Sequence, residues 1–138
     1  MKVLIIDDER AIRRALKEIL EYENCQVLEA ENGKEGLELI RSNSLDVIFC
    51  DIKMHFLHLF DDLEQVQSEG NEVPIIMISG HGTLETAVQA IKIGAFDFIE
   101  KPLDLNRILV ILRNVKDRNQ LVQETKILKT TVKKIKFG

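Results

Sequence analysis

Three carboxylates stand directly after two short apolar runs of the sequence. Asp7 and Asp8 follow the run at residues 3–6, and Asp51 follows the run at residues 47–50. If both runs are parallel strands, the three side chains meet at one edge of a sheet. Carboxylates held together repel one another, and a hard divalent cation with oxygen ligands, such as Mg²⁺, relieves that repulsion. Because a carboxylate can also accept a phosphoryl group, the pattern predicts phosphoryl transfer to Asp51.

Two further polar residues follow later apolar runs and suit the same chemistry. Ser79 comes after residues 73–78, and Lys101 comes after residues 95–100. A hydroxyl can donate a hydrogen bond to a phosphoryl oxygen, and an ammonium neutralises the charge of the transferred group. Taken singly, these residues and the carboxylates have ordinary structural roles as a helix cap, a turn residue or a surface charge. Their common position at the ends of predicted strands favours function.

The elements that must position these residues alternate regularly along the chain. Short apolar runs predict strands at residues 3–6, 26–30, 45–50, 73–78 and 95–100. Helical spacing predicts inward faces formed by Ile12, Ala15, Leu16, Ile19 and Leu20, by Leu37 and Ile40, by Phe56, Leu59, Phe60, Leu63 and Val66, by Leu84, Ala87, Val88 and Ile91, and by Leu105, Ile108, Leu109, Leu112 and Val115. Alternation of strand and helix implies an α/β fold, with a parallel sheet covered by helices on both faces.

Capping and turn residues place several of the boundaries between these elements. Asp8 is a candidate N-cap for the first helix, and Thr83 for the helix after the fourth strand. Asn32 and Gly33 predict a turn before the second helix, and Gly94 is suited to end the helix before the fifth strand.

Length and composition exclude several classes of protein. The chain has 138 residues, of which 45% are hydrophobic and 30% are charged, as expected for a single globular domain. It contains neither a signal-peptide pattern nor an apolar run near the ~20 residues of a membrane-spanning helix. Cys25 and Cys50 have neither the density of a disulfide framework nor the spacing of metal ligands, so we expect two core thiols in a cytoplasmic protein.

The charge is distributed unevenly along the chain. Residues 1–105 carry 10 Lys and Arg against 21 Asp and Glu, whereas residues 106–138 carry 9 against 2. A basic tail can bind nucleic acid, but this one lacks interleaved aromatic residues and a DNA-reading motif. We therefore expect a solvated helix face and no direct contact with nucleic acid.

The same tail carries a regular spacing of mostly apolar residues. Leu121, Thr125, Leu128, Val132 and Ile135 are spaced alternately 4 and 3 residues apart, as at the a and d positions of a coiled coil. The seam covers about two heptads, which is fewer than a safe assignment needs. A short dimerising coiled coil and one long, partly frayed helix are both open.

The motif residues together resemble the receiver domain of bacterial two-component response regulators. The resemblance rests on Asp7-Asp8-Glu9, on Asp51 with Met54 three residues later, on Ser79-Gly80, on Gly94-Ala95 and on Lys101-Pro102. It covers about residues 1–118, and stretches 79–82 and 94–103 are most similar to receivers of enhancer-binding, nitrogen-regulation-type transcriptional activators. It implies a flavodoxin-like (βα)5 fold with strand order 2-1-3-4-5, a receiver domain over residues 1–118, and a helical linker over residues 119–138 that leads towards an output domain.

The resemblance also assigns roles to the acidic residues. Asp51 would accept the phosphoryl group from the phosphohistidine of a sensor histidine kinase. Asp7, Asp8, Asp51 and the backbone carbonyl of Lys53 would bind Mg²⁺. Such a domain is a switch for transcription regulation and not a turnover enzyme, although it catalyses its own phosphorylation. We also expect a homodimer, formed through the linker helix or through a face of the receiver.

Further roles follow for residues of the last two strands. Ser79 and Lys101 would hold the phosphoryl oxygens, and the peptide bond from Lys101 to Pro102 would be cis. Phe98 lies three residues before the lysine, at the position of an aromatic switch that turns inward when Ser79 moves. A plain core aromatic is the alternative interpretation of Phe98.

One segment departs from the family pattern. Family members usually follow the methionine with proline and place glycine four residues later, whereas this chain has His55 and Leu59. The change removes the residues that shape the loop beside the acceptor, so we expect impaired phosphorylation or a displaced helix. Residues 55–62 also offer a weak transition-metal site at His55, His58 and Asp61 or Asp62, and an apolar patch at residues 56–60 for self-association.

Two other functions are therefore open. A degenerate receiver would act as an interaction or dimerisation module without efficient phosphorylation. A small hydrolase would use Asp51 as a nucleophile in a haloacid-dehalogenase-like scheme. That scheme needs an acid two residues after the nucleophile, where this chain has Lys53.

Overall fold

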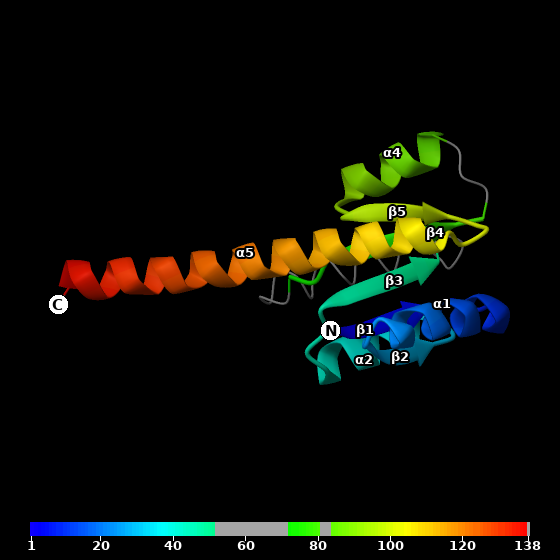
Figure 1. Cartoon of the computed structure of the whole chain (residues 1–138), viewed down its shortest axis with the longest axis horizontal. Coiled ribbons are helices and arrows are strands. Elements are labelled where there is room, and N and C mark those ends of the chain that lie inside the picture. The colour runs from blue at the N-terminus through cyan, green and yellow to red at the C-terminus, as the bar shows by residue number, and fades with distance from the viewer. Residues whose placement is uncertain (52–71, 81–83, 138) are drawn as a thin grey trace.

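The structure, a computed structural model of the whole chain, describes residues 1–51, 72–80 and 84–137. Its elements are β1 (Lys2–Ile6), α1 (Arg10–Tyr22), β2 (Gln26–Ala30), α2 (Gly33–Ser42), β3 (Val47–Asp51), β4 (Ile75–Ser79), α4 (Leu84–Ile93), β5 (Asp97–Glu100) and α5 (Leu105–Phe137) (Figure 1). The strands form one parallel sheet in the order β2-β1-β3-β4-β5. The predicted α/β class and strand order are confirmed, while the helix predicted around residues 56–66 lies outside the described residues.

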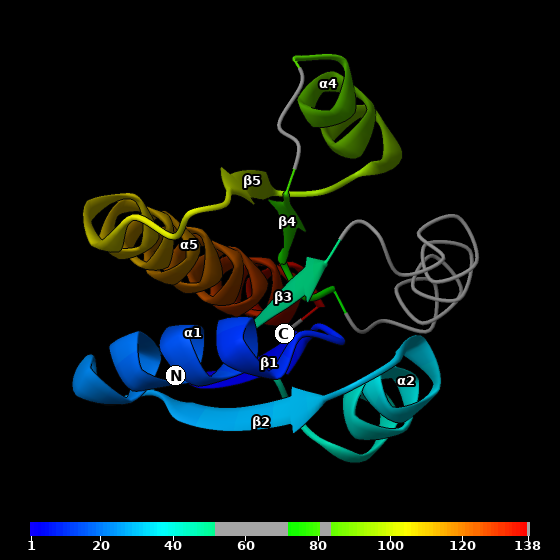
Figure 2. The same ribbon diagram turned by 90° about the vertical axis from the view of Figure 1, so that its right-hand side faces the viewer.

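Side chains alternate along the central strands and divide between two helical layers. One core cluster joins the sheet to α1 and α5 and includes Val3, Ile5, Phe49, Leu16, Leu20, Ile108 and Ile111. The other joins the opposite face to α2 and includes Leu4, Ile6, Cys50, Met77 and Ile40. Figure 2 shows α1 and α5 on one side of the sheet and α2 on the other. Strands β3 and β4 are buried throughout because both of their faces are covered, which explains their continuously apolar sequences.

Two predicted helix starts differ from the structure. The N-cap of α1 is Glu9 and not Asp8, and no side chain makes a capping hydrogen bond there. The Asp8 carboxylate lies instead with the other acids of the sheet edge. Asn32 and Gly33 begin α2 directly, because the Asn32 side chain caps the helix by accepting the backbone N–H of Glu35 at 2.9 Å.

The apolar faces of three helices are narrower than their spacing predicts. Val88 and Ile91 of α4 are 44% and 47% exposed, and Leu105 at the start of α5 is 50% exposed. Ala15 of α1 is exposed as well. In α4 the reason is its place beside the edge strand β5, where the sheet covers only part of the helix (Figure 2). Ile111 of α5, absent from the predicted face, is fully buried.

The last helix runs unbroken from the domain into the tail. α5 spans Leu105–Phe137 and extends well beyond the sheet (Figure 1). Leu121 and Leu128 of the predicted seam are 63% and 64% exposed, and Ile127 between them is 56% exposed. Within the described residues, none of the helices is apolar over a length that would cross a membrane.

Backbone and cysteine predictions hold at three positions. Gly94 follows α4 with a φ of 114°, in the left-handed region that favours glycine, so its predicted role in ending the helix is confirmed. Its N–H donates to the carbonyl of Ile91 at 3.1 Å. Cys25 and Cys50 are both free and buried, as expected of core thiols.

Candidate functional site

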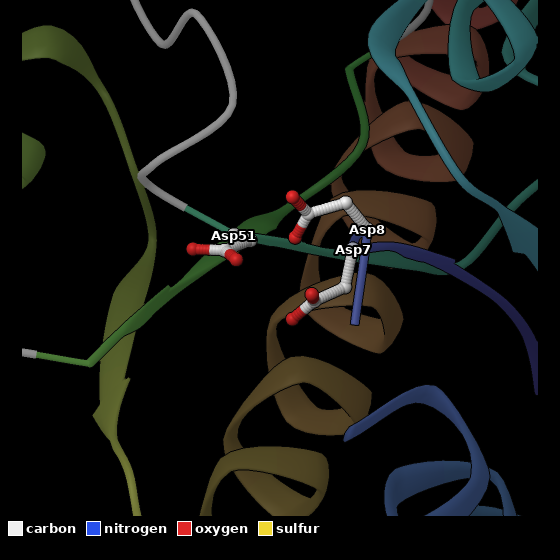
Figure 3. Close-up of side chains that lie close together, drawn as sticks. All are labelled: Asp7, Asp8 and Asp51. Carbon is white, nitrogen blue, oxygen red and sulfur yellow. The ribbon is translucent and has the colours of Figure 1, made fainter. Parts of the chain in front are cut away.

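The three acids that follow β1 and end β3 meet at one edge of the sheet. Asp7 and Asp8 come directly after β1, and Asp51 is the last residue of β3, its neighbour in the sheet. One oxygen from each side chain lies within 4.8 Å of those of the other two. Figure 3 shows the carboxylates of Asp7 and Asp8 projecting towards the end of β3, where Asp51 lies. Asp7 and Asp51 are fully buried, whereas Asp8 is exposed.

Lys101, directly after β5, brings an ammonium group to this cluster. Its Nζ lies 3.7 Å from Asp7 Oδ2, 3.6 Å from Asp51 Oδ2 and 3.3 Å from Glu9 Oε1. Its side chain is only 12% exposed, and burial alone would lower its pKa. The negative charges of Asp51 and Asp7 outweigh that effect and hold the pKa of Lys101 above its ordinary value, so the group stays a cation.

Two hydrogen bonds fix Asp7, one through its backbone and one through its carboxylate. Its N–H donates to the carbonyl of Ala30 at 3.1 Å, and its Oδ1 accepts the N–H of Glu9 at 2.8 Å. Its buried Oδ2 accepts no hydrogen bond from the part of the chain that the structure describes. Burial, together with the nearby charge of Asp51, raises the pKa of Asp7 from 3.8 to about 6, although the Glu9 hydrogen bond and Lys101 act in the opposite direction.

This donor set fits a hard divalent cation. Three carboxylates offer oxygen ligands around one point, and a buried oxygen of Asp7 still lacks a hydrogen bond among the described residues. Burial is the main cause of the raised pKa of Asp7 and the charge of Asp51 adds to it, so a bound divalent cation would stabilise the charged form of Asp7. Mg²⁺ binds through few carboxylates and retains waters, which suits an open cluster with one exposed member. Lys53, whose backbone carbonyl is the further predicted ligand, lies outside the described residues.

Ser79 and Phe98 lie close to this edge on the last two strands. Ser79 ends β4 and is 4% exposed, and its carbonyl accepts the N–H of Lys101 at 2.8 Å. Phe98 lies within β5 and is partly buried against the core cluster beneath α2. The Arg107 guanidinium lies 5.9 Å from the centre of the Phe98 ring and donates to the Phe98 carbonyl at 3.1 Å. The peptide bond from Lys101 to Pro102 is cis, as predicted.

Two residues that contact the site were not singled out from the sequence. Glu9, the third acid after β1, contacts Lys101 and occupies the N-cap position of α1. Arg13 is only 7% exposed, and its Nη1 donates to the carbonyl of Asp7 at 2.7 Å. The one signal in the sequence is its position three and seven residues before Leu16 and Leu20, on the same face of the helix.

Cys50 is a buried thiol next to Asp51 in the sequence. Burial raises the pKa of Cys50 far above its ordinary value, and the nearby charges of Asp51 and Asp7 act in the same direction. The thiol is therefore neutral and unreactive at physiological pH. The other predicted features of this region, the segment at residues 55–62 and the cap at Thr83, lie outside the described residues.

Comparison with known proteins assigns the family. Residues 3–113 match the family described as the response regulator receiver domain. The chain belongs to this family. Among curated receivers it is similar to the nitrogen assimilation regulatory protein NtrX of Azorhizobium caulinodans, with 40% identity over 92% of this chain. It is also similar to the response regulator protein PilR of Pseudomonas aeruginosa, with 37% identity over 78% of this chain.

Solved receiver structures agree with this assignment. NtrX from Brucella abortus has a TM-score of 0.83 at 35% identity, over 92% of this chain and 28% of its own. A receiver domain from Clostridium thermocellum has a TM-score of 0.77 at 34% identity, over 88% of this chain and 98% of its own. The chain spans only 28% of the length of the Azorhizobium relative and 24% of PilR. The chain thus corresponds to a receiver domain, a signalling domain that also occurs in longer regulators.

Proposed function

We propose that this receiver domain accepts a phosphoryl group on Asp51 from the phosphohistidine of a sensor histidine kinase. The observation that carries the proposal is the position of the Lys101 ammonium, 3.6 Å from Asp51 and 3.7 Å from Asp7, both fully buried. A fixed cation beside the acceptor is ready to neutralise the charge that arrives with the phosphoryl group. Preorganised charge of this kind is the main contribution that a protein makes to phosphoryl transfer.

In the proposed reaction, a carboxylate oxygen of Asp51 attacks the phosphorus atom in line with the leaving imidazole. A P–O bond forms while the P–N bond of the phosphohistidine breaks, and the electron pair leaves with the imidazole nitrogen. Asp7, Asp8 and Asp51, together with the backbone carbonyl of Lys53, would hold Mg²⁺, which would neutralise part of the negative charge of the transferred group. The receiver thus catalyses its own modification by holding acceptor and countercharges in place.

Ser79 and Lys101 complete the proposed phosphoryl site. The Ser79 hydroxyl donates to one phosphoryl oxygen, and the Lys101 ammonium pairs with another. Ser79 ends β4, Lys101 directly follows the neighbouring strand β5, and their backbones share a 2.8 Å hydrogen bond, so a movement of Ser79 would shift the end of β5. We propose that Phe98, on that strand, then turns inward and alters the surface beside α4. Its partial burial is compatible with both orientations.

The consequences for the whole protein belong to the same proposal. Residues 1–118 form the receiver, and residues 119–138 form a linker to an output domain that regulates transcription, as in the longer relatives. The domain works in the cytoplasm, contact with nucleic acid falls to the output domain, and the receiver forms a homodimer. The degenerate alternative has no support in the described residues, since the acids, the serine and the lysine all stand at their strand ends.

Intact-mass spectrometry tests the central proposal. The chain is incubated with acetyl phosphate and Mg²⁺, and separately with a phosphorylated histidine kinase. We expect the mass of one added phosphoryl group on the wild-type chain and none on Asp51→Asn. A folded wild-type chain that gains no phosphoryl group from either donor would be the degenerate receiver. Release of many equivalents of phosphate per chain would indicate the hydrolase instead.

A further inference from the structure

Among the described residues, Arg13 is the one buried arginine, and its contacts indicate its role. It lies in the first turns of α1 with 7% exposure, whereas its neighbour Arg14 on the same helix is exposed. A buried guanidinium is strongly unfavourable unless hydrogen bonds and opposite charges satisfy it. The contacts that satisfy Arg13 therefore indicate what its burial achieves.

Those contacts connect the end of β1 to the end of β2. Arg13 Nη1 donates to the carbonyl of Asp7 at 2.7 Å. On its other side, Nε lies 3.6 Å from Glu29 Oε1 and Nη2 lies 3.7 Å from Glu31 Oε1. The two glutamates belong to β2 and the residue after it, so they hold the planar guanidinium from the neighbouring strand.

Among the described residues, no backbone N–H donates to the carbonyl that Arg13 contacts. The paired residues of β1 and β2 end at Ile6 and Ala30, one residue before Asp7. The Asp7 N–H still donates to Ala30, but its carbonyl lies beyond the last strand residue, and Arg13 takes the place of the next strand bond. Leaving a buried carbonyl without a hydrogen bond lowers stability by about as much as losing a hydrogen bond. The charged guanidinium of Arg13 satisfies this carbonyl, and hydrogen bonds from charged donors are stronger than neutral ones.

The same carbonyl belongs to the peptide unit that joins Asp7 to Asp8. A peptide unit is planar, so a hydrogen bond to its oxygen fixes the orientation of the bond between the two acids. That orientation sets the directions in which the two carboxylates leave the backbone, and with them the convergence of Asp7, Asp8 and Asp51 within 4.8 Å.

We infer that Arg13 is a positioning residue that holds the Asp7–Asp8 peptide in the geometry required for divalent cation binding, with Glu29 and Glu31 fixing its guanidinium. The inference rests on the proposed function, because it assigns a residue to the same cation site. Arg13 touches neither the cation nor the phosphoryl group, and it acts only through the backbone of Asp7. Groups that orient ligands in this indirect way typically change metal affinity by roughly 10–100-fold when removed.

Direct titration with Mg²⁺ and Mn²⁺ tests the inference without any phosphorylation assay. Binding is followed by isothermal titration calorimetry and by backbone amide shifts in nuclear magnetic resonance spectra, which also report whether each variant is folded. The variants are Arg13→Gln, Arg13→Lys and the matched control Arg14→Gln, which removes an exposed arginine one residue away. We expect about tenfold or greater weakening for Arg13→Gln, partial recovery for Arg13→Lys and no change for Arg14→Gln.

The outcomes separate the inference from the proposed function. If the wild-type chain binds neither cation, the proposed site fails and the inference fails with it. If the wild type binds but folded Arg13→Gln binds equally well, the positioning role alone is overturned. A purely structural role would lower the unfolding temperature of the cation-free variant without changing its cation affinity. If Arg13→Gln does not fold, the cation affinity of Arg13→Lys provides the test. A cation affinity of Arg13→Lys equal to that of the wild type would show that the planar guanidinium contact is not needed.

Discussion

The buried charge of Asp7 should make the cation-free protein less stable as the pH rises. Its pKa is about 6 in the folded chain, against an ordinary value of 3.8. Between these two values the folded chain keeps a proton that the unfolded chain has released, so stability falls as the pH increases through this window. Above about pH 6 the folded and the unfolded chain have both lost the proton, so the destabilisation caused by the buried charge of Asp7 no longer changes with pH. At ~1.4 kcal/mol for each pH unit, the full difference is roughly 3 kcal/mol.

The perturbation that isolates this effect is Asp7→Asn. The amide oxygen of asparagine still accepts the Glu9 N–H, which Asp7 Oδ1 accepts at 2.8 Å, while the titrating charge disappears. Loss of the ion pair with Lys101 offsets part of the gain at high pH. The prediction therefore concerns the slope of the unfolding free energy against pH and not its absolute value. Glu18→Gln, which neutralises an exposed carboxylate of α1, is the control.

Urea unfolding in EDTA at several pH values on both sides of about 6 measures that slope. We expect the wild type and Glu18→Gln to lose stability across the window, by up to about 3 kcal/mol relative to Asp7→Asn. Saturating Mg²⁺ should then stabilise the wild type more above the window than below it, because the cation competes with the proton for the cluster. Equal pH dependence in the wild type and Asp7→Asn would refute the claim that Asp7 is the buried group that titrates.

Three further predictions concern Glu9, the helical tail and Gly94. Glu9→Gln removes the charge of a half-exposed carboxylate that competes for Lys101 at 3.3 Å. It should tighten the binding of beryllofluoride, a phosphoryl analogue, in the presence of Mg²⁺ by at most about fivefold, as measured by calorimetry. Weaker binding would instead mean that Glu9 supports the cation. Truncation after Arg118 should convert a concentration-dependent dimer into a monomer in sedimentation velocity, and an unchanged oligomer would show that the tail is dispensable. Because residues 119–138 carry 5 lysines and one glutamate, added salt should favour the dimer. Gly94→Ala should lower the free energy of unfolding in urea by about 1–2 kcal/mol. The added methyl would contact nothing within 4 Å, so the loss would come only from the backbone conformation at a φ of 114°. Unchanged stability would contradict that explanation.

The fold and the centre of the site were accessible from the sequence because their determinants are local. Buried parallel strands have continuous apolar sequences, and each one delivers its next polar residue to the same edge of the sheet. Asp7, Asp51 and Lys101 could therefore be brought together without coordinates. Ala15 and Val88 were misassigned because helical spacing identifies an apolar face but does not show how much of that face a neighbouring element covers.

Contacts between distant residues were beyond the sequence. Glu9 and Lys101 are 92 positions apart, and no pattern in either segment pairs them. Arg13 lies at a core position by its spacing from Leu16, yet an arginine there is ordinarily assigned to the surface. Its burial depends on the glutamates at the end of β2, so it follows from the packing of α1 against that strand and not from α1 alone.

The charges at the sheet edge link Asp51, Lys101 and the proposed cation site. Asp7, Asp8, Asp51 and Glu9 supply four carboxylates around the single ammonium of Lys101 among the described residues. Lys101 alone cannot balance this cluster, and a phosphoryl group on Asp51 adds further negative charge. Transfer of a phosphoryl group to Asp51 would therefore need a second positive charge, which a divalent cation would provide. In the proposed site, the carboxylates that would bind the cation are the same ones whose repulsion it would relieve. Any change that spreads them apart should therefore weaken cation binding first and phosphoryl transfer as its consequence.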